Sequence, residues 1–179
     1  MLGARKLKIA WGDTRIYWSW KYMPESRFPE VASLITVCWL DISGKFHAKY
    51  LSSNTTYGVY FVYKEHPAID RCYGFERTPV EASVVEADEE EPSIDDNEHP
   101  IKNFYLKVAS YTRALSEHYP TQRNDGWLEV EMSRYHVGEN ALNERQVLEM
   151  RIKQTKHLIW KSGIIVYGFE LRPLDSLLA

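Results

Sequence analysis

The stretch Thr56-Tyr-Gly-Val-Tyr-Phe-Val-Tyr-Lys64 places Tyr57, Val59, Phe61 and Tyr63 on one face of an extended chain, because successive side chains along a β-strand point to opposite sides. Aromatic and β-branched residues also fit a half-buried, pleated surface better than a helix. The stretch therefore predicts a strand over residues 56–64.

Runs of the same kind occur on both sides of this strand. Residues 6–11 place Leu7, Ile9 and Trp11 on one face. Further runs cover residues 34–42, 80–87, 103–109, 127–132 and 164–171. Seven or more short strands, separated by Gly, Pro, Asn and Asp, are typical of an antiparallel sandwich or barrel. The sequence thus predicts an all-β fold.

Two segments do not follow the strand pattern. Residues 26–34 contain Pro29 at a position that suits the first turn of a helix, so a short helical turn is predicted there. Residues 139–156 are rich in strong helix formers, which favours a helix over part of the segment. The second half of that segment, residues 147–153, also alternates and fits a strand.

Residues 86–100 form a strongly acidic segment, Glu-Ala-Asp-Glu-Glu-Glu-Pro-Ser-Ile-Asp-Asp-Asn-Glu-His-Pro. A segment with so few apolar residues buries too little surface to offset the entropy lost on ordering. We interpret it as a long, flexible acidic loop inserted between two strands. The whole chain, residues 1–179, is then expected to form a single domain.

Composition excludes several classes of protein. The net charge of −3 argues against binding to nucleic acid through bulk positive charge. No apolar run approaches the ~18 residues of a membrane span. The first residues carry no signal-peptide pattern, so a cytoplasmic or nuclear location is expected. Cys38 and Cys72 are expected to be free thiols, with a single bridge as the alternative.

Motifs for catalysis, metals and cofactors are absent from the sequence. The six histidines lack metal-ligand spacing, and there is no Gly-x-Ser-x-Gly or phosphate-binding loop. Glu129 and Glu131 share a strand face, but such a pair is typical of a solvated surface. We therefore expect a protein that is not an enzyme and that needs neither a metal nor a cofactor.

The window Trp11-Gly-Asp-Thr-Arg-Ile-Tyr-Trp-Ser-Trp20 holds half of the six tryptophans. Large rings beside a Gly-Asp turn either fill a core or present a stacking surface to a ligand. Both interpretations remain open for Trp11 and Trp18. The other tryptophans are expected in the core: Trp20, Trp39, Trp127 and Trp160.

This window is followed by further motifs in a fixed order. They are Glu25-Ser-Arg-Phe-Pro-Glu-Val-Ala32, Val37-Cys-Trp-Leu-Asp-Ile-Ser-Gly-Lys45, Asp125-Gly-Trp-Leu-Glu-Val-Glu131 and Trp160-Lys-Ser-Gly-Ile-Ile-Val-Tyr-Gly-Phe-Glu-Leu-Arg-Pro173. Together they closely resemble the plant phloem-lectin family, also called Nictaba-like lectins. The resemblance runs from about Leu7 to Pro173 and is densest at the two ends.

The resemblance implies a jelly-roll-like β-sandwich that binds N-acetylglucosamine oligomers or the N-glycan cores of glycoproteins. It also implies no catalysis, no metal, a cytosolic or nuclear location, and frequent homodimers. Two family tryptophans linked to sugar binding fall on Trp11 and Trp18. Two acidic family positions linked to it are occupied here by Val147 and Gln154, which carry no charge.

A sugar site suggests a role for each candidate residue. Trp11 and Trp18 are expected to stack on the apolar face of a pyranose ring. Asp13, Glu25 and Gln154 are expected to hydrogen-bond its hydroxyl and acetamido groups. The alternative function is a protein-interaction scaffold of the same fold with weak or lost sugar binding, whose partner docks on residues 86–100.

Overall fold

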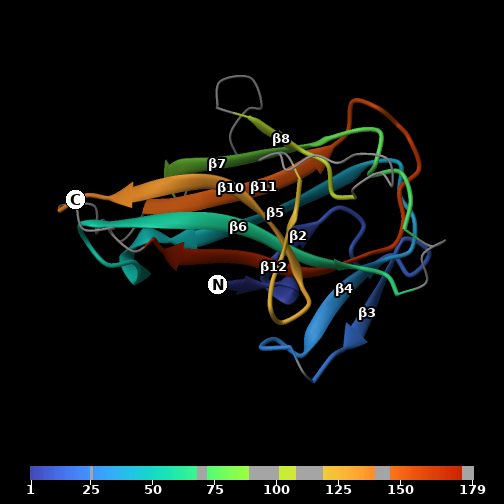
Figure 1. Cartoon of the computed structure of the whole chain (residues 1–179), viewed down its shortest axis with the longest axis horizontal. Helices are drawn as coiled ribbons and strands as arrows, with labels where there is room; N and C mark the ends of the chain where they lie inside the picture. Colours follow the sequence, from blue (N-terminus) through green and yellow to red (C-terminus); the bar gives the residue numbers. More distant parts are fainter. Residues whose placement is uncertain (25, 68–71, 89–100, 108–118, 140–145, 175–179) are drawn as a thin grey trace.

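The computed structural model describes residues 1–24, 26–67, 72–88, 101–107, 119–139 and 146–174. Over these residues the chain forms two antiparallel sheets that pack against each other (Figure 1). The prediction of an all-β sandwich is therefore confirmed. No helix in the described part of the chain is long and apolar enough to cross a membrane.

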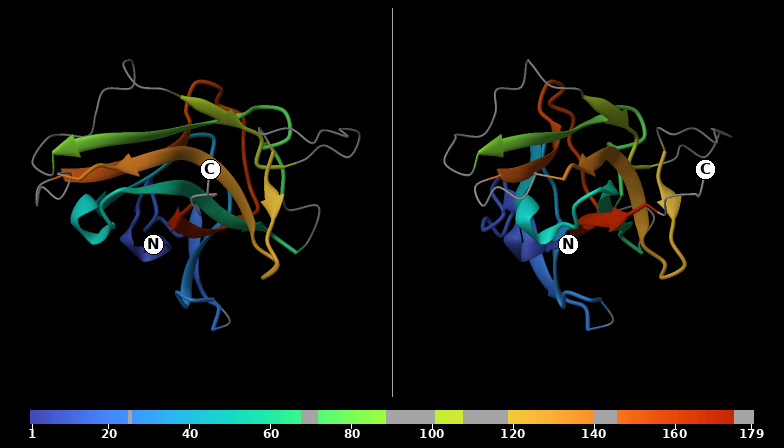
Figure 2. Two further views of the ribbon diagram at one scale, coloured as in Figure 1. Left: turned by 60° about the vertical axis from the view of Figure 1, so that its left-hand side comes forward. Right: turned by 90° about the vertical axis from the view of Figure 1, so that its left-hand side faces the viewer.

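The larger sheet has seven strands. Its main path runs β3-β4-β12-β6-β10-β9, and β1 pairs with β12 beside that path. The strands are β1 (Leu2–Gly3), β3 (Trp18–Tyr22), β4 (Glu30–Leu34), β6 (Thr55–Glu65), β9 (Thr121–Gln122), β10 (Leu128–Val137) and β12 (Ile164–Pro173). The β3–β4 hairpin projects from the rest of the molecule (Figure 2).

The smaller sheet has five strands in the order β2-β5-β11-β7-β8. They are β2 (Lys8–Ile9), β5 (Leu40–His47), β7 (Val80–Asp88), β8 (Lys102–Phe104) and β11 (Gln146–Gln154). Two short 3-10 helices, η1 (Ala4–Lys6) and η2 (Ala48–Tyr50), follow β1 and β5.

The core lies between the two sheets. Phe61 and Tyr63 of β6 stack with ring centroids 5.5 Å apart, and Phe169 of β12 packs against Phe61. Met150 and Ile152 of β11 join the same cluster from the other sheet. The predicted strand over residues 56–64 is thus confirmed, with its aromatic face turned inward.

The predicted strand over residues 34–42 is wrong. β4 ends at Leu34 and β5 begins at Leu40, because the chain leaves one sheet there and enters the other. The connection is held by Ile35, whose N–H donates to the Tyr17 carbonyl at 2.8 Å, and by a bridge between Val37 and Lys161. An apolar run therefore covers a crossover instead of a strand.

The predicted helical turn over residues 26–34 is also wrong. Residues 30–34 form β4, which pairs with β3 on one side and with β12 on the other. The Pro29 carbonyl accepts a hydrogen bond from the Met23 N–H at 2.6 Å, so Pro29 lies in the hairpin and starts no helix. Cross-strand pairing on both sides outweighs the local signal of a proline.

Of the two predictions for residues 139–156, the structure confirms the strand and not the helix, since residues 146–154 form β11. β11 pairs with β5 and β7 along its whole length and buries Leu148, Met150 and Ile152, which outweighs its helix propensity. Residues 140–145 lie outside the described residues.

Other predicted elements change only in extent. The strand predicted at residues 103–109 is the three-residue β8, and the run at 127–132 extends to Val137. Of the acidic segment, residues 86–88 continue β7, and residues 89–100 lie outside the described residues.

Candidate functional site

Trp11 lies in the connection between β2 and β3 and combines exposure with an unusual backbone. Its residue is 49% exposed, and its φ is +54°, in the left-handed region. A bulky residue rarely adopts this conformation, because its Cβ approaches the following carbonyl. The indole packs on the Tyr17 ring, with centroids 5.7 Å apart at 49°. The left-handed turn also explains why Trp11 leaves the inward face predicted from Leu7 and Ile9.

Two tryptophans of β3 form hydrogen bonds to this connection. The Trp18 indole Nε1 donates to the Ala10 carbonyl at 3.1 Å, and the Trp20 Nε1 donates to the Gly12 carbonyl at 3.1 Å. These bonds fix the backbone of Ala10 and Gly12, the two residues next to Trp11 in the chain. The Arg5 guanidinium lies 3.7 Å from the centroid of the Trp20 ring.

The structure corrects the role expected of Trp18. Its residue is only 2% exposed and belongs to the main core cluster. The ring therefore has no free face on which a sugar could stack. Trp18 supports the connection that carries Trp11, while Trp11 alone of this pair offers an exposed ring.

Asp13 lies in an open hollow beside β3, with a cavity volume of about 470 Å³. Its walls are Gly12, Asp13, Arg15, Trp18, Ser19 and Trp20. Arg15 supplies donors and Asp13 supplies acceptors, so this hollow offers both kinds of polar partner. Sequence reasoning missed Arg15 and Tyr17, although both fall inside the tryptophan-rich window.

Gln154 lies elsewhere, at the end of β11. Its residue is 4% exposed, and neither its Nε2 nor its Oε1 has a hydrogen-bond partner. It lines a separate hollow of about 80 Å³ together with Glu81, Asn103 and Lys156. The structure thus brings Trp18 and Asp13 to one hollow, which neither Trp11 nor Gln154 lines. Glu25 lies outside the described residues.

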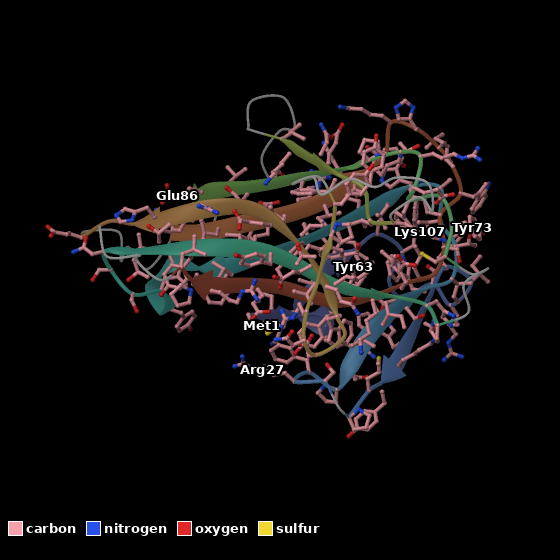
Figure 3. The ribbon with its side chains drawn as sticks, in the orientation of Figure 1. Met1, Arg27, Tyr63, Tyr73, Glu86 and Lys107 are labelled. Carbon is pink, nitrogen blue, oxygen red and sulfur yellow. The ribbon has the colours of Figure 1, made fainter. Side chains whose placement is uncertain are left out.

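Two tryptophans expected in the core are exposed. Trp39 is 42% exposed and Trp160 is 53% exposed, whereas Trp127 is buried as expected. Both exposed rings belong to connections at one end of the sandwich, which a Val37–Lys161 bridge and a Tyr73–Ser162 bridge tie together. Tyr73 marks this end in Figure 3.

Lys161 fixes these connections from inside. Its residue is buried, and its Nζ donates to the carbonyls of Ile159 at 2.6 Å and Cys38 at 2.9 Å. Burial lowers the pKa of this ammonium from its usual value to about 8. Lys161 of the Trp160-Lys-Ser-Gly motif therefore has a structural role, because it joins two connections at this end of the sandwich.

The carboxylates on the outer face of the larger sheet are engaged in ion pairs. Glu129 pairs with Arg123 at 3.3 Å and with Arg172 at 2.7 Å, and Glu131 pairs with Arg134 at 2.8 Å. Glu129 and Glu131 thus belong to ion pairs on this face of the sheet. Among the described residues, no group of three or more His, Cys, Asp or Glu side chains could hold a metal ion.

Comparison with known proteins identifies relatives of the whole chain. A model of the phloem protein 2 family matches residues 1–173. The chain is 37% identical to the F-box protein PP2-B10 of Arabidopsis thaliana over 177 residues, which cover 99% of the chain and 61% of that protein. It is 38% identical to the putative F-box protein PP2-B12 of the same plant, covering 99% of the chain and 62% of that protein.

A third relative, the F-box protein At2g02240 of Arabidopsis thaliana, is 35% identical over 98% of the chain and 52% of its own length. The chain thus spans between half and two thirds of the length of these relatives. The match of residues 1–173 to the family model shows that this chain belongs to the phloem protein 2 family.

Proposed function

We propose that this domain is a non-catalytic carbohydrate-binding module that recognises glycans containing N-acetylglucosamine, with Trp11 as its stacking platform. The observation that carries the proposal is the half-exposed Trp11 ring on a left-handed backbone. Strained residues persist only where the surrounding structure holds them, and they cluster at functional sites. The two indole hydrogen bonds from Trp18 and Trp20 supply that hold.

The chemistry of the exposed ring suits a sugar. A pyranose has one apolar C–H face, which a flat indole covers, and a rim of hydroxyls that need polar partners. Asp13 and Arg15 line a hollow that includes Gly12, the residue after Trp11, and they offer acceptors and donors for that rim. A shallow site of this kind binds one sugar with a Kd of about 1 mM, so useful affinity requires several contacts or two sites in a dimer.

Gln154 supplies a further argument for an N-acetylated ligand. Its buried carboxamide has both an unused donor and an unused acceptor. An acetamido group carries the matching acceptor and donor, and unpaired buried polar atoms are costly. In this proposal Gln154 takes such a group in its own hollow, separately from the Trp11 platform. The proposed location of the module is the cytoplasm or the nucleus.

Isothermal titration with chitotriose tests the proposal. The wild type is expected to bind in the millimolar range or more tightly, and Trp11→Ala is expected to lower the affinity at least tenfold. Trp160→Ala is the matched control, because it removes an equally exposed indole from another connection. Absence of heat and of chemical-shift changes for the wild type at millimolar chitotriose would contradict the proposal.

A second candidate function is protein interaction, and a specific observation favours it. Large apolar side chains are exposed together on the connections near Tyr73: Ile35, Trp39, Tyr73, Leu158, Ile159 and Trp160. Exposed apolar patches often mark protein-binding surfaces. The names of the relatives, which are F-box proteins, agree with a role in a larger assembly.

The two functions make opposite predictions for two variants. A protein partner on the patch is expected to be lost in Trp160→Ala and retained in Trp11→Ala. Sugar binding is expected to show the reverse. Deleting residues 89–100 separates the functions further, because a partner that docks on the acidic segment would be lost while sugar binding remains.

A further inference from the structure

A polar hollow lies on the outer face of the smaller sheet, close to the Trp11 connection. Its volume is about 90 Å³, and its walls are Lys8, Ala10, Asp41, Ser43, Glu149 and Arg151. These residues come from neighbouring chain segments: Lys8 pairs with Ser43, and Ser43 pairs with Arg151. The hollow is therefore built across three adjacent strands.

Small residues open this hollow, and an ion pair fixes one wall. Ala10 and Ser43 leave space among the longer side chains of the same face. Arg151 donates to Asp41 through two bonds, Nε to Oδ1 at 2.8 Å and Nη2 to Oδ2 at 2.6 Å. A bidentate pair of this kind holds both side chains in one geometry. The ion pair thus fixes this wall of the hollow.

Glu149 provides an independent sign that a ligand is expected. Its residue is 6% exposed, yet its Oε2 accepts no hydrogen bond. The Lys45 Nζ forms an ion pair with that oxygen at 3.9 Å, which is too long for a hydrogen bond. Buried carboxylate oxygens normally have donors, and an oxygen that lacks one is costly. Glu149 thus lines the hollow with a carboxylate whose hydrogen-bonding capacity is not fully used.

The charges around the hollow indicate the class of ligand. Lys8 and Arg151 are cationic, and Asp41 and Glu149 are anionic, so the lining charges cancel. A phosphate would meet two carboxylates, and a metal cation would meet two cationic side chains. A neutral group that both donates and accepts suits all four charged side chains, and sugar hydroxyls have that property.

We infer that this hollow is a second subsite, which binds the hydroxyls of a sugar residue next to the one stacked on Trp11. Ala10 lines the hollow and directly precedes Trp11 in the chain, and its N–H donates to the Asp41 carbonyl at 2.9 Å. One short segment thus belongs to both subsites. The inference rests on the proposed glycan-binding function and specifies its ligand as an oligosaccharide that spans both subsites.

Ser43→Val tests the subsite, with Ser83→Val as its matched control. Valine fills the hollow and removes a hydroxyl while it keeps a residue that favours strands. Ser83 pairs with Arg151 from the opposite side and does not line the hollow. The probes are chitotetraose and free N-acetylglucosamine, and thermal unfolding verifies that both variants are folded.

The expected result is a selective loss. Ser43→Val is expected to bind chitotetraose about tenfold more weakly and N-acetylglucosamine as the wild type does. Ser83→Val is expected to match the wild type with both probes. The Arg151 Nε–H signal in NMR spectra is expected to shift with chitotetraose in the wild type and in Ser83→Val.

Two outcomes overturn the inference, and only the second also overturns the proposed function. If Ser43→Val binds chitotetraose like the wild type while Trp11→Ala loses it, the subsite is wrong and the proposed function stands. If the wild type binds neither sugar at millimolar concentration, the proposed function fails and the subsite fails with it.

Discussion

Trp11 combines a strained backbone with the stacking role that we propose for its ring. Its left-handed backbone costs about 1–2 kcal/mol for a residue with a Cβ, and glycine avoids that cost. We predict that Trp11→Gly is more stable than Trp11→Ala by about 1 kcal/mol, although glycine also gains more entropy in the unfolded chain. Urea unfolding of the two variants measures this difference.

Both variants remove the indole, so both are expected to lose sugar binding equally. The usual order at an ordinary position, with alanine more stable than glycine, would show that the φ of +54° is not kept in solution.

Lys161 carries a prediction about pH. Burial lowers the pKa of its ammonium to about 8, below its value in the unfolded chain, so the unfolded chain holds more protons between pH 8 and 10.5. The contribution of Lys161 to stability therefore rises as pH increases through that range, by up to about 3 kcal/mol. Comparing the wild type with Lys161→Met at pH 7 and pH 10 isolates this effect.

The comparison with Lys161→Met cancels the other titrating groups. Burial raises the pKa of the Cys72 thiol to about 12, which makes both proteins less stable at high pH by the same amount. A difference between the two proteins that stays constant with pH would contradict the shifted pKa of Lys161.

At the scale of the element, Gly168 allows β1 to pair closely with β12. Its φ is +149°, and a Cβ on it would lie 1.9 Å from the Leu2 carbonyl oxygen. Because that neighbour is backbone, Gly168→Ala must displace β1, and we predict a loss of about 3 kcal/mol or more. Gly126→Ala is the control, since it also has a positive φ but has no atom within 4 Å. It is expected to lose only about 1 kcal/mol in urea unfolding.

The strands show how far local patterns predict this fold. The strand pattern located β6 and β12, whose apolar residues are buried on both faces over most of each strand. It could not separate β4 from β5, because the crossover at residues 35–39 is as apolar as the strands around it. The identity of β11 depended on its neighbours β5 and β7, which lie far away in the sequence.

The β3 strand leads to a prediction about the support of Trp11. Trp20→Phe keeps an aromatic ring but removes the Nε1 bond to the Gly12 carbonyl. We expect a stability loss of about 1 kcal/mol and faster amide exchange at Gly12 and Thr14. Sugar affinity is expected to fall several-fold even though Trp11 itself is unchanged. Unaltered exchange in this connection would show that the indole bond does not hold it.

At the scale of the whole molecule, the sequence predicts part of the candidate site but not its arrangement. The tryptophan-rich window indicated an aromatic platform, yet of its three tryptophans only Trp11 is exposed, because β3 turns Trp18 inward and leaves Trp20 partly buried. Nothing in the linear order places Gln154 relative to Trp11, since it pairs with Leu40 through sheet register. The hollow around Ser43 depends on the register of three strands in the same way.

The two sheets are held together without a covalent link in the described residues, and this gives a prediction for the whole domain. Cys38 and Cys72 are both free thiols, as expected from the sequence. A native disulfide contributes about 2–4 kcal/mol, and each kcal/mol shifts the Tm of a domain of this size by about 2–4 °C. The Tm is therefore expected to change by less than about 1 °C when a reductant is added. A decrease of about 5 °C or more would reveal a bridge, and the two-sheet core around Phe61 would then not suffice to explain the stability of the fold.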